Sequence, residues 1–128
     1  MSYSVEVSVP FVARQGLRSP VRAANAQAPA APEQGFSVVL RAGVSFQEEQ
    51  LNDRGWFVDT DAVETALQQC AKHLAGDSWT HLFDFRPTFE LIARWAFREL
   101  EPAIPGLEYV TLENATLGVL TKYAPTAD

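Results

Sequence analysis

Residues 36 to 46 read Phe-Ser-Val-Val-Leu-Arg-Ala-Gly-Val-Ser-Phe, and apolar side chains return along them at every second position. The apolar set is Phe36, Val38, Leu40, Ala42, Val44 and Phe46. A period of two is typical of a β-strand that buries one face. At about 3.3 Å per residue this stretch extends roughly 36 Å. We therefore expect the strand to reach well past a small core.

Three other segments alternate in a similar way. From Tyr3 to Val9, a tyrosine and valines oppose serines and a glutamate, which predicts a half-buried strand. Residues 107–113 and 117–123 predict two more strands. The short Asn114-Ala115-Thr116 segment between them predicts a hairpin turn.

Two segments instead follow the helical period. Residues 61–75 carry an apolar stripe and begin with Asp61 and Glu64 at capping-box spacing, and Gly76 marks the end. The stripe consists of Val63, Leu67, Cys70 and Leu74. A second helix is predicted from Pro87-Thr88, and Pro102 ends it. Its stripe is Phe89, Ile92, Ala93, Ala96, Phe97 and Leu100.

The element order is strand, strand, helix, helix, strand, strand. It predicts an α+β fold, with an antiparallel sheet covered by two helices on one face, in one domain over residues 1–128. Residues 16–33 are rich in Ala, Pro, Gln and Asn and predict a long loop. Four strands leave two exposed edges, which closure between subunits would cover. We expect a homo-oligomer built around a shared β-barrel.

The charge balance narrows the classes of function. Ten Lys and Arg against sixteen Asp and Glu give a net charge of −6. This is the wrong sign for binding nucleic acid or an anionic membrane surface, so we expect neither as a partner. The sequence shows neither a secretory leader nor the ~18 continuous apolar residues that span a bilayer, and we expect a cytoplasmic protein. A single cysteine, Cys70, excludes an internal disulfide and any CxxC motif.

Three stretches, taken with this element order, resemble the 6-pyruvoyl-tetrahydropterin synthase and 6-carboxytetrahydropterin synthase family. Gly55-Trp56-Phe57-Val58-Asp59 is similar to the family's Gly-Met-Val-x-Asp before the first helix. Pro87-Thr88-Phe89-Glu90-Leu91-Ile92-Ala93 is similar to its Pro-Thr-x-Glu-Asn-x-Ala at the start of the second helix. Val110-Thr111-Leu112-Glu113, with Tyr123 in the last strand, is similar to its Val-x-Val-x-Glu-Thr and terminal Tyr.

The resemblance implies the tunnelling fold, or T-fold. It also implies trimeric barrels stacked as a hexamer, with pterin sites between subunits. Glu113 is then the candidate pterin anchor, since a carboxylate matches the parallel donors of the ring N–H and 2-amino group. Thr88 and the Phe89 amide are candidates for the pterin carbonyl, because the first N–H groups of a helix lack intrahelical partners. The alternative is that Glu113 is a solvated charge and Thr88 only a helix cap.

This sequence departs from the family's pattern at the three zinc-binding histidines and at one cysteine. The family binds catalytic zinc with three histidines, and the matching positions here are Gln15, Gln34 and Phe36. An amide is a poor zinc ligand and a phenyl ring is none, so we expect no metal and no other cofactor. The family's cysteine between the first two strands is also missing, since residues 16–33 contain none.

The family's Asp-His pair before the second helix corresponds to Thr80-His81. The imidazole of His81 therefore survives without its orienting carboxylate. Asp77 and Asp84 are possible local partners, and the alternative is that His81 is only polar surface.

Three functional hypotheses follow. The first is a homologue that binds a pterin-like heterocycle at subunit interfaces but does not catalyse the parent synthase reaction. The second is a metal-independent, lyase-like pterin-modifying enzyme that uses His81. The third is a purely structural or partner-binding barrel.

Overall fold

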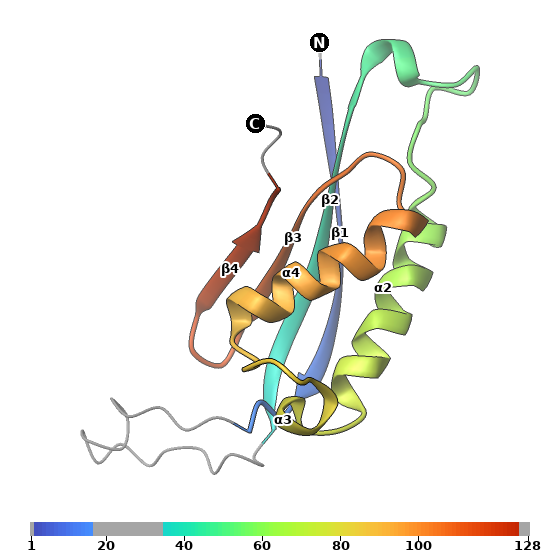
Figure 1. Ribbon diagram of the computed structural model, residues 1–128. Coiled ribbons are helices and arrows are strands. Elements are labelled where there is room, and N and C mark those ends of the chain that lie inside the picture. Colours follow the sequence, from blue (N-terminus) through green and yellow to red (C-terminus); the bar gives the residue numbers. More distant parts are fainter. Residues whose placement is uncertain (1, 17–34, 126–128) are drawn as a thin grey trace.

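The structure, a computed structural model, describes residues 2–16 and 35–125. Within them, two helices of three to four turns cover one face of a four-stranded antiparallel sheet (Figure 1). The elements are β1 (Ser2–Ala13), β2 (Phe36–Gln47), η1 (Glu48–Gln50), α2 (Thr60–Ala75), α3 (Trp79–Leu82), α4 (Phe89–Leu100), η2 (Glu101–Ala103), β3 (Leu107–Asn114) and β4 (Val119–Tyr123). The predicted α+β class is confirmed. Residues 17–33 of the predicted loop lie outside the described residues.

The strands pair in sequence order, β1-β2-β3-β4, so β1 and β4 form the two edges of the sheet. β1 and β2 pair along their whole lengths, from Ser2 opposite Gln47 to Ala13 opposite Phe36. The predicted first strand was therefore too short at its C-terminal end. Pro10 is accommodated within it because β1 is an edge strand, where a missing N–H need not break a ladder.

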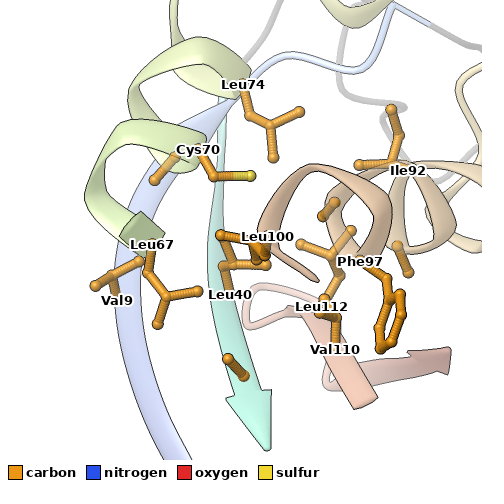
Figure 2. Packing of buried hydrophobic residues seen from close by; sticks show 14 of the residues in the cluster. Val9, Leu40, Leu67, Cys70, Leu74, Ile92, Phe97, Leu100, Val110 and Leu112 are labelled. Carbon is orange, nitrogen blue, oxygen red and sulfur yellow. The ribbon is translucent and has the colours of Figure 1, made fainter. Parts of the chain in front are cut away.

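The hydrophobic core lies between the sheet and the two long helices. α2 packs on β1, while α4 packs on β3 and β4. The predicted stripes of both helices face this core, and Val9, Leu40, Leu67, Ile92 and Leu112 are at most 1 % exposed. Figure 2 shows side chains from sheet and helices meeting in this layer. Among residues 2–16 and 35–125, no helix lies on the opposite face of the sheet, which we call the helix-free face.

Two helix predictions need correction. α2 begins at Thr60, because the Asp59 carboxylate accepts a hydrogen bond from the Ala62 N–H at 3.1 Å and caps the helix. The predicted Asp61 and Glu64 capping box is thus wrong. The four-residue helix α3 was not predicted, since one turn is too short to show a period.

The last hairpin also differs in detail. β4 starts at Val119 rather than at residue 117, because residues 115–118 form the turn. The Asn114 side chain stabilises this turn by accepting from the Leu117 N–H at 3.1 Å. Among the described residues, no helix is long and apolar enough to cross a membrane.

Candidate functional site

Glu113 lies on the helix-free face, in the middle of the sheet. Val110 and Leu112 on the same strand are buried under the helices, so the alternation of β3 turns Glu113 to the other side. One carboxylate oxygen, Oε1, accepts a hydrogen bond from Arg41 Nη2 of β2 at 2.7 Å. The two side chains are 30 % and 25 % exposed, so this is a partly buried ion pair. Arg41 Nε also lies 3.8 Å from Glu6 Oε1 of β1.

Tyr109 extends the polar network across the same face. Its hydroxyl donates to Glu6 Oε2 at 2.7 Å, and Lys122 Nζ lies 4.1 Å from the centre of its ring. The hydrogen bond to Glu6 is the main cause that raises the pKa of Tyr109, because it favours the protonated phenol. The network therefore joins side chains from all four strands.

Thr88 and Phe89 lie in the helical layer, at the start of α4. Thr88 is the N-cap, and its Oγ1 accepts from the Leu91 N–H at 3.2 Å. A hydroxyl that accepts one bond still has its own proton to donate. The Gln15 amide is nearby, since its Nε2 donates to the Pro87 carbonyl at 3.0 Å.

Phe36, which the resemblance matches to a zinc histidine, lies in an aromatic cluster. The Phe36 ring lies 6.0 Å from the Trp79 ring and 5.9 Å from the Phe89 ring, and the last two are 5.4 Å apart. Trp79 is fully buried and donates from its indole to the Leu74 carbonyl. Within residues 2–16 and 35–125, no group of three His, Cys, Asp or Glu side chains is arranged to hold a metal. The described residues therefore offer no donor set that fits a zinc ion.

His81 on α3 pairs with Asp77, one of the two acidic partners considered from the sequence. His81 Nδ1 lies 3.3 Å from Asp77 Oδ1, and Arg14 Nη2 lies 3.9 Å from the same oxygen. The Ser78 N–H donates to that oxygen at 2.7 Å. This backbone bond, followed by the His81 hydrogen bond, lowers the pKa of Asp77. The imidazole is 71 % exposed, so any reaction there would be open to water.

Within one subunit, these candidates fall into two groups. One group lies at the start of α4 and consists of Thr88, Phe89 and Gln15. The other is Glu113, which lies on the helix-free face. In the described part of the chain, no hydrogen bond or ion pair joins Glu113 to the first group. Single-subunit geometry thus does not assemble the predicted site.

The register of β3 adds a second observation on the anchor. In the pattern Val-x-Val-x-Glu, alternation puts the glutamate on the same face as the two apolar residues. Val110 and Leu112 face the helices, and the next residue on that face is Asn114, whose side chain is engaged in the hairpin turn. Glu113 lies one residue earlier, on the other face, so its register differs from that of the family's Val-x-Val-x-Glu pattern, in which Asn114 takes the glutamate position.

Sequence reasoning missed Arg41, Glu6 and Tyr109. Each occupies the polar side of an alternating strand, which by itself indicates only a solvated face. The signal appears once β2 is paired with β1 and β3, because Arg41 then lies opposite Ser8 and Thr111, next to both glutamates.

Comparisons with known proteins bear on the fold and the family. The structure of the Caenorhabditis elegans 6-pyruvoyl tetrahydropterin synthase is similar over 98 % of this chain and 97 % of that chain, with a TM-score of 0.70 and 14 % sequence identity. This similarity confirms the predicted T-fold. A search of curated proteins finds no match. The sequence model of 6-pyruvoyl tetrahydropterin synthase matches residues 35–123, more than half of the chain, and the chain therefore belongs to the 6-pyruvoyl tetrahydropterin synthase family.

Proposed function

We propose that this protein binds a pterin-like heterocycle between subunits and does not catalyse the parent synthase reaction. The protein is one domain over residues 1–128, and it forms trimeric barrels that stack as a hexamer in the cytoplasm. The observation that carries the proposal is the partly buried Glu113 carboxylate, which Arg41 holds in place on the helix-free face. A carboxylate fixed in this way presents oriented acceptors to a ring N–H and an amino group.

Assembly has to bring the two groups of candidates together. β1 and β4 are the free edges of the sheet, and Val12, Val119 and Leu120 near them are 61 %, 53 % and 55 % exposed. Apolar side chains beside unpaired edges favour pairing with another copy. Because edge-to-edge closure keeps the helices outside the barrel, Glu113 of one subunit and the Thr88 hydroxyl and Phe89 amide of a neighbour can share one ligand only at the rim of the barrel.

The loss of the parent reaction is argued from the zinc positions. Catalytic zinc needs three protein N, O or S donors and one open position. Gln15 donates its amide to a backbone carbonyl, and Phe36 is packed against Trp79 and Phe89. A phenyl ring has no lone pair to donate and an amide oxygen is a poor ligand for zinc, while Gln34, the third matched position, lies outside the described residues. We therefore expect no stoichiometric zinc in the purified protein.

Calorimetric titration with neopterin, biopterin and related purines tests the binding proposal. We expect Glu113→Gln to lose at least about tenfold in affinity, because the ring donors lose a charged acceptor. Glu108→Gln is the matched control, since Glu108 is an exposed glutamate on the same strand. Equal binding by both variants would argue against Glu113, and no binding by the wild type would argue for a purely structural barrel.

The pair formed by His81 and Asp77 favours a second candidate function, a metal-independent lyase-like reaction on a pterin. Asp77 orients the imidazole through Nδ1, which leaves Nε2 to take or give a proton. Such an enzyme would turn over a dihydropterin in the presence of chelator.

Turnover measurements separate this candidate from simple binding. Activity in chelator should vanish in His81→Ala and fall in Asp77→Asn. Asp84→Asn is the control, because the structure pairs His81 with Asp77. Activity that is unchanged in His81→Ala would exclude His81 as the base.

A further inference from the structure

A groove of about 400 Å³ lies between the two long helices. α2 and α4 supply most of its lining, and the segments around α3 and η2 supply the rest. Small-molecule sites have volumes of roughly 300–1,000 Å³, so this groove is large enough for one small ligand. None of Glu113, Thr88 and Phe89 lines it, and the groove is therefore separate from the candidate heterocycle site.

Three aromatic side chains from different parts of the chain line this groove together. His73 of α2 stacks on Trp95 of α4, with 5.3 Å between the ring centres. Phe83, the C-cap of α3, lies edge-on to both, 4.9 Å from Trp95 and 6.0 Å from His73. Trp95 and Phe83 are half-buried, so part of each ring remains accessible from the groove. The faces of such rings carry negative electrostatic potential and attract cations, most strongly at tryptophan.

Glu99 places a negative charge in the same groove. It follows Trp95 by four residues on α4, a spacing that makes the two side chains neighbours on one face of the helix. Its carboxylate also acts on the Cys70 thiol of the facing helix, since it adds to the effect of burial in raising the pKa of that thiol. Among the described residues that line the groove, Glu99 is the only acid, and none is Lys or Arg. The electrostatics of the groove therefore favour a cation, as does the net charge of −6 of the whole chain.

A quaternary ammonium ion fits these two features better than other charged groups. Its methyl groups are apolar and spread the positive charge, so they can contact Trp95 while the buried Cys70 and Leu100 offer apolar surface. A primary ammonium is strongly hydrated and has three N–H donors to satisfy, which aromatic rings do poorly. An anion would be repelled by Glu99 and would meet no Lys or Arg among the described lining residues.

We propose that the groove between α2 and α4 binds a small organic cation with a quaternary ammonium group, which lies against Trp95 and beside Glu99. Both determinants stand one turn apart on α4, so a single helix positions the ring and the counter-charge. This second site lies in the helical layer, and its occupancy is independent of heterocycle binding through Glu113.

Choline and its neutral isostere 3,3-dimethylbutan-1-ol test the need for a positive charge, because the two molecules share one shape. Dissociation constants are measured by ligand-observed NMR titration above neutral pH, since a protonated His73 would repel a cation. We expect the protein to bind choline at least about tenfold more tightly than the alcohol, because only the cation gains from the ring faces and from Glu99. Equal affinities, or a dissociation constant for choline weaker than about 10 mM, would overturn the proposal.

Substitutions on α4 test the place of the cation. Trp95→Leu should weaken choline binding at least about tenfold and Trp95→Phe less, because tryptophan is the strongest aromatic partner of a cation. Glu99→Gln should weaken it about threefold or more through the loss of the counter-charge. The matched controls are Trp56→Leu, a 47 % exposed tryptophan outside the groove, and Glu90→Gln, an exposed glutamate of α4 that does not line it. Both should keep the wild-type affinity.

Each outcome supports or overturns the groove as the site. Wild-type affinity in Trp95→Leu and Glu99→Gln would place the cation elsewhere. Thermal melting shows whether the Trp95 variants fold; if they do not, the exposed Glu99 and the comparison of choline with its isostere still decide. Saturating choline should leave the calorimetric affinity for neopterin unchanged, and competition between the two would overturn a separate site. A protein that binds choline but no heterocycle would contradict the proposed function and leave the cation site standing.

Discussion

The ring of Tyr109 lies directly over Gly43, its register partner on the neighbouring strand. A Cβ atom built on Gly43 would overlap the Tyr109 ring, so only glycine leaves room for the ring. Across this gap the Tyr109 hydroxyl reaches Glu6 on the far side of β2, at 2.7 Å. The absence of one methyl group thus permits a contact between β3 and β1, which are not adjacent in the sheet.

Gly43→Ala should destabilise the protein by about 1–3 kcal/mol, because the new methyl group displaces the Tyr109 ring from the sheet. Urea unfolding measures the change. Gly76→Ala is the matched control: Gly76 has a φ of −73°, which alanine adopts readily, and we expect its free energy of unfolding to stay within about 1 kcal/mol of wild type. In a Tyr109→Ala background the Gly43→Ala effect should largely disappear; a loss of the same size there would assign it to something other than the ring.

The pair formed by Arg41 and Glu113 should contribute to stability as well as to recognition. Both side chains are about one-quarter to one-third exposed, so solvent weakens the interaction. We expect a coupling energy of about 1 kcal/mol in a double-mutant cycle that combines Arg41→Met with Glu113→Gln. Unfolding in urea gives the four free energies. Strictly additive effects would show that the two side chains do not stabilise each other.

The raised pKa of Tyr109 gives a pH dependence in the alkaline range. The folded pKa lies above the ordinary value of 10.0 because Glu6 accepts from the phenol. The contribution to stability is therefore complete below pH 10.0 and is lost as the pH rises through the folded pKa. In Glu6→Gln, the pKa should fall and the alkaline decline in the free energy of unfolding should become shallower. Ultraviolet titration of phenolate, with Tyr109→Phe to assign the signal, provides the measurement.

Cys70 should be almost unreactive in the folded protein. Burial is the main cause that raises the pKa of its thiol from 9.0 to about 12, and the side chain lies on the core-facing side of α2. Because the thiolate is the nucleophile, labelling by an aromatic disulfide near neutral pH should be at least about a hundredfold slower than in the unfolded chain. Labelling kinetics with and without denaturant test this. Equal rates would mean that the reagent reaches the Cys70 thiol through the adjacent groove of about 400 Å³.

Periodicity predicted the parts of the fold that are governed by one strand or helix at a time. The alternation from Phe36 to Phe46 and the stripe from Val63 to Leu74 are set by which side chains face the core. These apolar side chains are buried as predicted, except for Phe36, which is half-buried. Helix starts and turns depend instead on single side chains that compete for the same N–H groups. Asp59, rather than Asp61, caps α2 for this reason.

The candidate site could be predicted less well, because it depends on register. The sequence locates Glu113 but not its face, since shifting a pattern by one residue turns every side chain over. Arg41 is 72 positions away along the chain and meets Glu113 only through the pairing of β2 with β3. No local pattern contains that information.

A single histidine placed at position 36 should not create a metal site. Phe36→His removes a ring that packs against Trp79 and Phe89 and puts a polar imidazole in its place, so we expect a loss of about 1–3 kcal/mol in stability. Phe36→Leu keeps the position apolar and should lose less. Zinc content, measured on the purified variants, should stay far below one ion per chain, because one imidazole does not supply the three donors of a catalytic site. Stoichiometric zinc in Phe36→His would instead show that the remaining donors are already in place, and would contradict the proposed loss of the zinc site.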